Sequence, residues 1–271
     1  MLAPSTNTDI VSSSADAGRG PATIRLPLLA AWTLAGFLAW AVGTALTLPA
    51  RGARRAVRVW AFRGWSRGVL RILGVRLAVE GQVPAAPFLL VSNHLSYLDI
   101  VVYAALLPAR FVAKREVRAW PVVGMLARAV GTIFIDRTIK RDAIRVVDDL
   151  AGAIADGDGV VLFAEATSSA GHGVLPFRSA LLDWAARTGH PVHFATVTYR
   201  TPVGAPPAHL AVCWWGDMTF GRHLVDLSRV GRIEATVRYG SAPIAEADRK
   251  RLAGRLHEAV SAQFTPVVTE S

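Results

Sequence analysis

The longest apolar stretch of the chain lies close to its N-terminus. Leu26 to Ala50 contains no charged residue over 25 positions. In a helix this run exceeds the roughly 20 residues that cross a bilayer. A cleaved signal peptide and a buried core helix are the competing interpretations, but the run is longer than a typical signal-peptide core and a polar stretch precedes it. The pattern therefore predicts a transmembrane helix.

An arginine-rich segment follows this helix and has two different sides. On a helical wheel, the apolar residues share one side and the basic residues share the other: Ala61, Trp65, Val69 and Ile72 against Arg63, Arg67 and Arg71. This pattern is typical of an amphipathic helix in the headgroup region of a membrane. Seven arginines lie between Arg51 and Arg71, whereas only two precede the apolar run. The asymmetry predicts a single-pass protein of the cell membrane whose C-terminal bulk lies on the cytoplasmic face.

The rest of the chain alternates short apolar runs with segments of helical periodicity. The predicted strands are 87–92, 110–113, 132–135, 160–163, 192–198, 210–215 and 232–238, and the predicted helices are 96–107, 141–155, 179–187 and 246–264. We expect an α/β fold, a mixed sheet flanked by helices. The predicted organisation is a disordered tail (1–22), a membrane anchor with an interfacial helix (23–75) and one catalytic domain (76–271).

Composition narrows the possible partners. The formal net charge of +10 favours an anionic partner, such as nucleic acid, an anionic membrane surface, or a phosphorylated or acidic-carrier substrate. A hydrophobic content of 52% favours the membrane, so no nucleic-acid partner is expected. The single cysteine, Cys213, excludes an intrachain disulfide and a cysteine-based metal cluster. Histidines outside the motif described next lack metal-ligand spacing, and no metal or cofactor is expected.

The motif Asn93-His94-Leu95-Ser96-Tyr97-Leu98-Asp99 directly follows a predicted strand. Two residues five positions apart point in different directions on one helix. His94 and Asp99 can meet only if His94 lies in the strand-to-helix turn and Asp99 in the first helical turn. Ser96 supports this placement because Ser-x-x-Asp resembles a capping box. A histidine with its own carboxylate is typical of general-base catalysis, although Asp99 could instead only stabilise the helix N-terminus.

Two further polar motifs follow predicted strands. Gly131 to Arg137 (GTIFIDR) places a guanidinium after one strand, and Phe163 to Ser169 (FAEATSS) places a carboxylate and hydroxyls after another. Because open α/β sheets bind ligands at the carboxyl ends of their strands, we expect the three motifs to converge on one cleft.

These three motifs, in this order, resemble those of the lysophosphatidate acyltransferase family: N-H-x4-D, G-x-x-F-I-D-R and F-P-E-G-T-R-S. Lys114 to Gly124 and Leu175 to Leu181 are also similar, so the resemblance covers about residues 55–240. It implies a membrane-associated α/β enzyme that uses a fatty acyl thioester of coenzyme A or acyl carrier protein as co-substrate and acylates a lysolipid.

The resemblance also implies roles for single residues. His94 matches the catalytic base and Asp99 the acid that orients it. Substrate-binding positions match Asn93, Lys114, Arg137, Glu165 and Thr167.

Departures from the family pattern lie in the third motif. Ala164 and Ala166 replace a proline and a glycine, and Ser168 replaces an arginine. Serine cannot replace a bidentate phosphate partner, and alanine disfavours the positive φ that glycine allows. Segments 168–177 and 213–220 are more similar to the branch that acylates lyso-ornithine lipid. Lysophosphatidate and lyso-ornithine lipid therefore both remain candidate acceptors.

Two alternative functions belong to other classes. Gly64-Trp65-Ser66-Arg67-Gly68 matches the G-x-S-x-G motif of serine esterases and lipases, which requires a strand before it and a helix after it. A catalytically silent lipid-binding protein is the second alternative, because the third motif is altered. Trp214 and Trp215 either line a substrate groove or pack within the core.

Overall fold

The computed structural model describes residues 22–136 and 140–268. The predicted disordered tail lies outside the described residues except for Ala22. The strands are β1 (Val75–Glu80), β2 (Phe88–Ser92), β3 (Ala109–Lys114), β4 (Ile133–Ile135), β5 (Gly159–Phe163), β6 (Val192–Arg200) and β7 (Ile233–Tyr239). The helices are α1 (Ala22–Leu46), α2 (Arg51–Leu73), α3 (Leu98–Leu106), α4 (Val123–Ala129), α5 (Lys140–Ala155), α6 (Asp183–Thr188), α7 (Ala208–Ala211), α8 (Phe220–Arg229) and α9 (Arg249–Gln263), with 3-10 turns η1 (Arg115–Ala119) and η2 (Ser179–Leu182).

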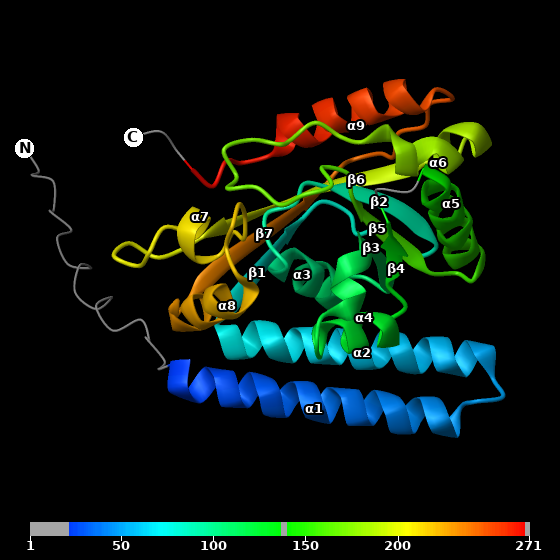
Figure 1. Cartoon of the computed structure of the whole chain (residues 1–271). Helices are drawn as coiled ribbons and strands as arrows, with labels where there is room; N and C mark the ends of the chain where they lie inside the picture. Colours follow the sequence, from blue (N-terminus) through cyan, green and yellow to red (C-terminus); the bar gives the residue numbers. More distant parts are fainter. Residues whose placement is uncertain (1–21, 137–139, 269–271) are drawn as a thin grey trace, which may run out of the picture.

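The seven strands form one mixed sheet in the order β1-β7-β6-β2-β5-β3-β4 (Figure 1). Neighbouring strands are parallel except for β6 and β7. All five residues of β2 and all five of β5 are buried, as expected for central parallel strands covered on both faces. The predicted mixed α/β fold is confirmed.

Helices cover both faces of this sheet and enclose two apolar clusters. α2, α3, α7 and α8 cover one face, where Tyr103, Phe111 and Tyr199 are buried. α5, α6 and α9 cover the other face around Leu150, Leu162 and Leu256 (Figure 1). Because the central strands are held from both sides, their carboxyl ends form a rigid edge for the site.

One predicted strand is wrong and several elements were not predicted. Residues 210–215 form the end of α7 and a loop, because Pro207 caps a short helix and a brief apolar run does not distinguish helix from strand. The short or weakly patterned elements β1, α4 and α8 were missed. The predicted helix at 179–187 is divided into η2 and α6.

α1 and α2 form an antiparallel hairpin rather than two separate membrane elements (Figure 1). α1 is the one helix among the described residues that is long and apolar enough to cross a bilayer. Glycines allow close packing along the pair: a Cβ atom at Gly43 would lie 2.7 Å from Val57 Cγ1, and one at Gly68 would lie 2.1 Å from Trp32 Nε1. The Trp32 indole N–H also donates to the Trp65 carbonyl oxygen at 2.9 Å.

Several arginines of α2 contact the α/β domain, so the basic side of the predicted interfacial helix is not directed only to lipid headgroups. Arg63 and Arg67 donate to backbone carbonyls of Ala105 and Leu106 at the end of α3. These carbonyls lie at the negative end of the α3 dipole, where cations are stabilising. The helix packs against α1 on one side and against α3 and β1 on the other, and wheel geometry alone did not reveal these neighbours.

Asp158 joins α2 to the sheet through three guanidinium groups. Its fully buried carboxylate accepts from Arg55 Nε at 2.8 Å, Arg58 Nη2 at 2.6 Å and Arg110 Nε at 2.6 Å. It lies immediately before β5, in the turn that ends α5. Burial opposes ionisation of Asp158, but the charges and hydrogen bonds of Arg58 and Arg110 outweigh it, so the pKa of this carboxyl is lowered.

Replacing Asp158 by Asn should loosen the α1–α2 hairpin. Removing one partner of a buried ionic cluster leaves uncompensated charge, so the free energy of unfolding should fall by about 3–5 kcal/mol. The contribution of a carboxyl with a lowered pKa is present above its unfolded pKa and is lost as the pH falls through the folded pKa. Chemical unfolding in detergent at neutral and acidic pH tests this, with the exposed Asp149→Asn as control. Equal stability of the two variants would contradict it.

Candidate active site

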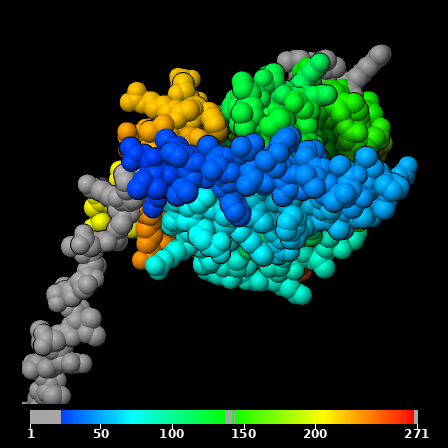
Figure 2. Space-filling model, turned by 90° about the horizontal axis from the view of Figure 1, so that it is seen from below, coloured from blue at the N-terminus to red at the C-terminus, as the bar shows by residue number. Residues whose placement is uncertain are grey.

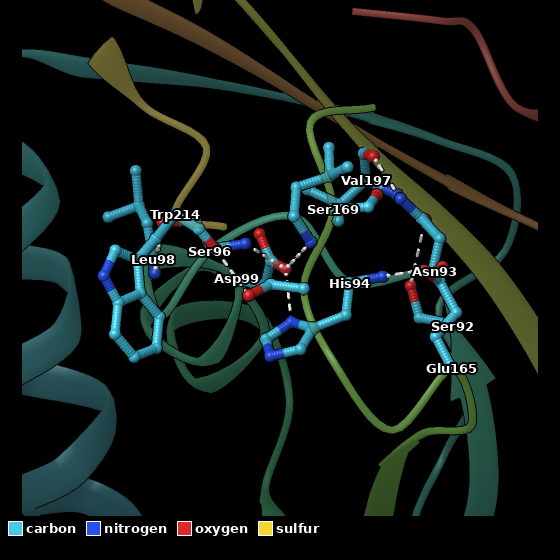
Figure 3. A network of polar contacts seen from close by, with 12 residues as sticks. Ser92, Asn93, His94, Ser96, Leu98, Asp99, Glu165, Ser169, Val197 and Trp214 are labelled. Carbon is cyan, nitrogen blue, oxygen red and sulfur yellow. Dashed lines mark hydrogen bonds and ion pairs between the residues drawn. The ribbon is translucent and has the colours of Figure 1, made fainter. Parts of the chain in front are cut away.

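The first predicted motif lies in the turn between β2 and α3, at the carboxyl end of a central strand (Figure 3). His94 is in this turn and Asp99 is the second residue of α3. His94 Nδ1 and Asp99 Oδ2 are 2.7 Å apart. The His94 side chain is 18% exposed and that of Asp99 is fully buried. The predicted juxtaposition is confirmed, because the strand-to-helix turn removes the angular separation that one continuous helix would impose.

Asp99 accepts four hydrogen bonds that hold it in one orientation. Oδ2 accepts from His94 Nδ1 and from the backbone N–H groups of Leu95, at 2.7 Å, and Ser96, at 3.0 Å. Oδ1 accepts from the Tyr199 hydroxyl at 2.7 Å. Burial, followed by the charge of Asp99, raises the pKa of Tyr199 well above its usual value, so this hydroxyl stays a donor.

The backbone of the turn explains how the motif forms. Ser96 Oγ accepts from the Leu98 N–H at 3.3 Å, while the Asp99 carboxylate reaches back to the Ser96 N–H. The two bonds resemble the predicted capping box, although Ser96 accepts from Leu98 instead of Asp99. Asp99 therefore begins the helix and orients the histidine with the same carboxylate, so the two roles that the sequence left open coexist.

Asn93 has a different role from the predicted one. Its amide donates to the Val197 carbonyl oxygen at 3.0 Å and accepts from the Val197 N–H at 2.8 Å, and the residue is only 1% exposed. The Asn93 side-chain amide thus forms, with Val197 of β6, the two hydrogen bonds that the backbone of a neighbouring strand would otherwise form. Asn93 positions the backbone beside His94 and does not present its side chain to a substrate.

Glu165 follows β5 and supports the same turn. Its Oε1 accepts from the His94 backbone N–H at 3.0 Å, and the residue is 4% exposed. Burial raises the pKa of Glu165 to about 8, against opposing hydrogen bonds from the backbone N–H groups of His94 and Leu175. Glu165 therefore carries a proton over most of the neutral range. The His94 ring itself stacks on Phe163, with ring centroids 4.2 Å apart.

Ala166 keeps the backbone conformation that the family glycine would favour. Its φ is +66°, so alanine adopts here the positive φ that it disfavours. A non-glycine residue in this region costs on the order of 1–2 kcal/mol. Hydrogen bonds around the loop offset that strain, including Ser169 N–H to His94 carbonyl at 3.1 Å and Arg178 N–H to Ala164 carbonyl at 2.8 Å.

The remaining predicted site residues lie along the same edge of the sheet or outside the described residues. Lys114 ends β3 and Thr167 follows β5, and both are exposed. Within the described part of the chain, neither residue forms a hydrogen bond or ion pair with His94 or Asp99, so their substrate-binding roles stay predictions. Arg137 follows β4 but lies outside the described residues. No cluster of three potential metal ligands occurs among the residues described.

The arrangement is suited to removing a proton from an alcohol. The Asp99 carboxylate can only accept the hydrogen bond from His94 Nδ1, so a neutral imidazole carries its proton on Nδ1. Its Nε2 is then unprotonated. An alcohol needs such a base within hydrogen-bond reach to attack an acyl carbonyl. Ser66, the alternative nucleophile, lies fully buried within α2 with no strand before it. This placement contradicts the serine hydrolase interpretation.

The sequence of this chain is similar to those of known proteins. Residues 76–200 match a family model described as Acyltransferase. A lyso-ornithine lipid O-acyltransferase from Brucella abortus is 36% identical over 73% of this chain and 82% of its own length.

The chain belongs to the acyltransferase family. A 1-acyl-sn-glycerol-3-phosphate acyltransferase from Neisseria meningitidis is 32% identical over 72% of this chain and 77% of that protein. The crystal structure of a 1-acyl-sn-glycerophosphate acyltransferase from Thermotoga maritima has the same fold, with a TM-score of 0.61 and 19% identity over 89% of this chain and 95% of the other. The family predicted from the three motifs is confirmed.

Sequence reasoning missed some residues that build the acyltransferase site. Tyr199 lies 100 positions after Asp99 and reaches it only because β6 neighbours β2. Tyr97 donates its hydroxyl to His223 Nδ1 at 3.0 Å, since His223 Nε2 faces the Cys213 carbonyl oxygen, which can only accept. Burial lowers the pKa of His223, which keeps it neutral. Neither tyrosine carries a recognisable signal in the sequence.

Replacing Glu165 by Gln should remove a pH dependence of stability. A carboxyl whose folded pKa is raised contributes stability below its unfolded pKa, and this is lost as pH rises through about 8. The wild type should therefore lose on the order of a few kcal/mol relative to Glu165→Gln between pH 6 and pH 9. Thermal unfolding of both proteins at the two pH values tests this. If the stability of the two proteins changed equally between pH 6 and pH 9, Glu165 would not be the group that titrates.

Proposed function

We propose that the chain transfers a fatty acyl group from a thioester, carried on coenzyme A or acyl carrier protein, to the free hydroxyl of a lysolipid in membrane lipid synthesis. The observation that supports this most directly is the 2.7 Å contact between His94 and Asp99 at a strand end, with the imidazole partly exposed. The Brucella and Neisseria relatives are named for lyso-ornithine lipid and for 1-acyl-sn-glycerol-3-phosphate. Both names describe acylation of a lysolipid.

The proposed reaction is a direct transfer. His94 Nε2 takes the hydroxyl proton as the acceptor oxygen attacks the thioester carbonyl carbon. A carbon–oxygen ester bond forms, the carbon–sulfur bond breaks, and the proton passes from the imidazolium to the departing thiolate. Asp99 keeps the tautomer and stabilises the imidazolium. Among the described residues, no serine or cysteine contacts His94 Nδ1 or Nε2 as an evident nucleophile, so the proposal includes no acyl-enzyme.

Substitutions in the motif test this mechanism against its rivals. His94→Ala should abolish transfer of a labelled acyl group from acyl carrier protein or coenzyme A to lysophosphatidate and to lyso-ornithine lipid. Asp99→Asn should lower kcat by about three to four orders of magnitude, as loss of an orienting carboxylate does elsewhere. Ser66→Ala should retain activity, because Ser66 Oγ is buried and, among the described residues, has no hydrogen-bond partner. Loss of activity in Ser66→Ala would favour a hydrolase, and an inactive wild type would favour a silent lipid-binding protein.

Membrane association forms the second part of the proposal. The outward face of α1 exposes large apolar side chains, namely Leu28, Leu34, Leu38, Val42 and Leu46. An exposed apolar strip of this length is typical of a membrane contact. If α1 crossed the bilayer, the packed α2 would carry its arginines into hydrocarbon at about 2.5–3.5 kcal/mol each. We therefore propose that α1 lies along the cytoplasmic leaflet with α2 between it and the domain, in place of the single-pass crossing predicted from sequence.

Labelling of the two ends of α1 distinguishes these topologies. Ile24→Cys and Leu46→Cys place thiols at opposite ends of the helix, and the native Cys213 is buried. A membrane-impermeant thiol reagent added to sealed inside-out vesicles should label both variants. In right-side-out vesicles it should label neither. Labelling of the two ends from opposite sides would instead establish a crossing helix.

A further inference from the structure

A cavity of about 360 Å³ lies next to the turn that carries His94, and its lining includes the rings of Trp120, Trp214 and Phe220. Its walls come from the turn before α4 and the loop before α8, and include Trp120, Pro121, Trp214, Met218 and Phe220. Figure 2 shows these segments, in green and gold, standing apart with a hollow between them beside α1. A lipid held at the proposed membrane face could therefore extend its head group into this aromatic pocket.

The rings of the pocket stand at steep angles to one another. Trp120 and Trp214 have centroids 6.1 Å apart at 84°, and Trp120 and Phe220 lie 5.8 Å apart at 53°. Tyr97 supports them from the catalytic motif, 5.9 Å from Trp214 and 4.9 Å from Phe220. The Tyr97 hydroxyl is held by His223. These rings pack directly against one another, and three of them, Trp120, Trp214 and Phe220, also border the cavity.

Hydrogen bonds connect this pocket to the acyltransferase site. The Trp214 N–H donates to the carbonyl oxygen of Leu95, the residue after His94, at 2.8 Å. Ser168, which occupies the position of the family arginine, donates its hydroxyl to the Trp214 carbonyl oxygen. The serine that removes a phosphate-binding guanidinium from the third motif thus fixes the backbone of an aromatic wall instead.

The side chains that line the pocket favour one class of ligand. Among the described residues, no lysine or arginine lines this cavity. A phosphate head group would require such cations. An ammonium group, by contrast, is attracted to the faces of aromatic rings, and to tryptophan most strongly. We propose that the pocket binds the side-chain ammonium of an ornithine head group, which makes a lysolipid with a cationic amine the preferred acceptor. This inference rests on the proposed function.

A strained turn holds one wall in place. Val122 has φ 60° and ψ −58°, and the Val123 N–H donates to the Pro121 carbonyl oxygen at 2.6 Å. These values describe a classic γ-turn, which is rare and strained in proteins. Strain of this kind persists where the surroundings enforce it, often at ligand clamps. The turn follows Trp120 directly and preorganises that ring for a ligand.

The experiment compares three acceptors with one acyl thioester: lyso-ornithine lipid, the same lipid acetylated on its side-chain amine, and lysophosphatidate. The wild type should use the free amine best. Trp120→Leu keeps an apolar wall but removes the ring, so KM for lyso-ornithine lipid should rise about tenfold with kcat within a fewfold. KM for the acetylated lipid should not change. Trp120→Phe should recover part of the loss, and Trp184→Leu, on α6, serves as a control for removing a tryptophan.

Binding without turnover separates this inference from the proposed function. The His94→Ala variant should retain labelled lyso-ornithine lipid in micelles more tightly than its acetylated counterpart, and additional Phe220→Leu should remove that difference. Equal binding or equal use of the free and acetylated amines by a folded protein would overturn the inference, as would a preference for lysophosphatidate. If the wild type acylates no acceptor but His94→Ala still discriminates the amine, the proposed function fails and the pocket assignment stands.

Discussion

The buried carboxylate of Asp99 is the contact on which the site depends. It caps the start of α3, receives two backbone N–H groups of the catalytic turn, holds the His94 imidazole and accepts the Tyr199 hydroxyl from β6. A carboxylate buried without such donors would be strongly destabilising. The hydrogen bonds that make its burial possible are therefore the same ones that fix the direction of the histidine. Stability of the turn and orientation of the base cannot be separated here.

A second carboxylate, Asp158, holds the α1–α2 hairpin on the sheet in a similar way. It draws Arg55, Arg58 and Arg110 together and so attaches α2 to the sheet. α2 in turn supports α1, whose outer face is apolar and exposed. The apolar outer face of α1 and the edge of the sheet that carries His94 are thus connected through α2 and Asp158. Under the proposed function, this connection would hold His94 at a defined position relative to an acceptor in the bilayer.

The third motif keeps a glycine-like backbone conformation although its side chains differ from the family pattern. Ala166 retains the positive φ of a glycine at an energetic cost, and Glu165 still supports the His94 backbone. Ser168, however, replaces a cation with a hydroxyl that holds the Trp214 loop. The conserved turn positions the chemistry, while the altered side chain affects the surface where an acceptor head group would bind.

The sequence by itself determined the parts that depend on local order: the central buried strands, the strand-to-helix turn that joins His94 to Asp99, the capping box and the family. Each of these follows from residues within a few positions of one another, whose chemistry allows few alternatives. Only the tertiary structure decided that Tyr199 completes the Asp99 cluster, that Asn93 binds β6, and that the arginines of α2 face the domain. These contacts join residues many positions apart, and no local pattern records which strand or helix becomes a neighbour.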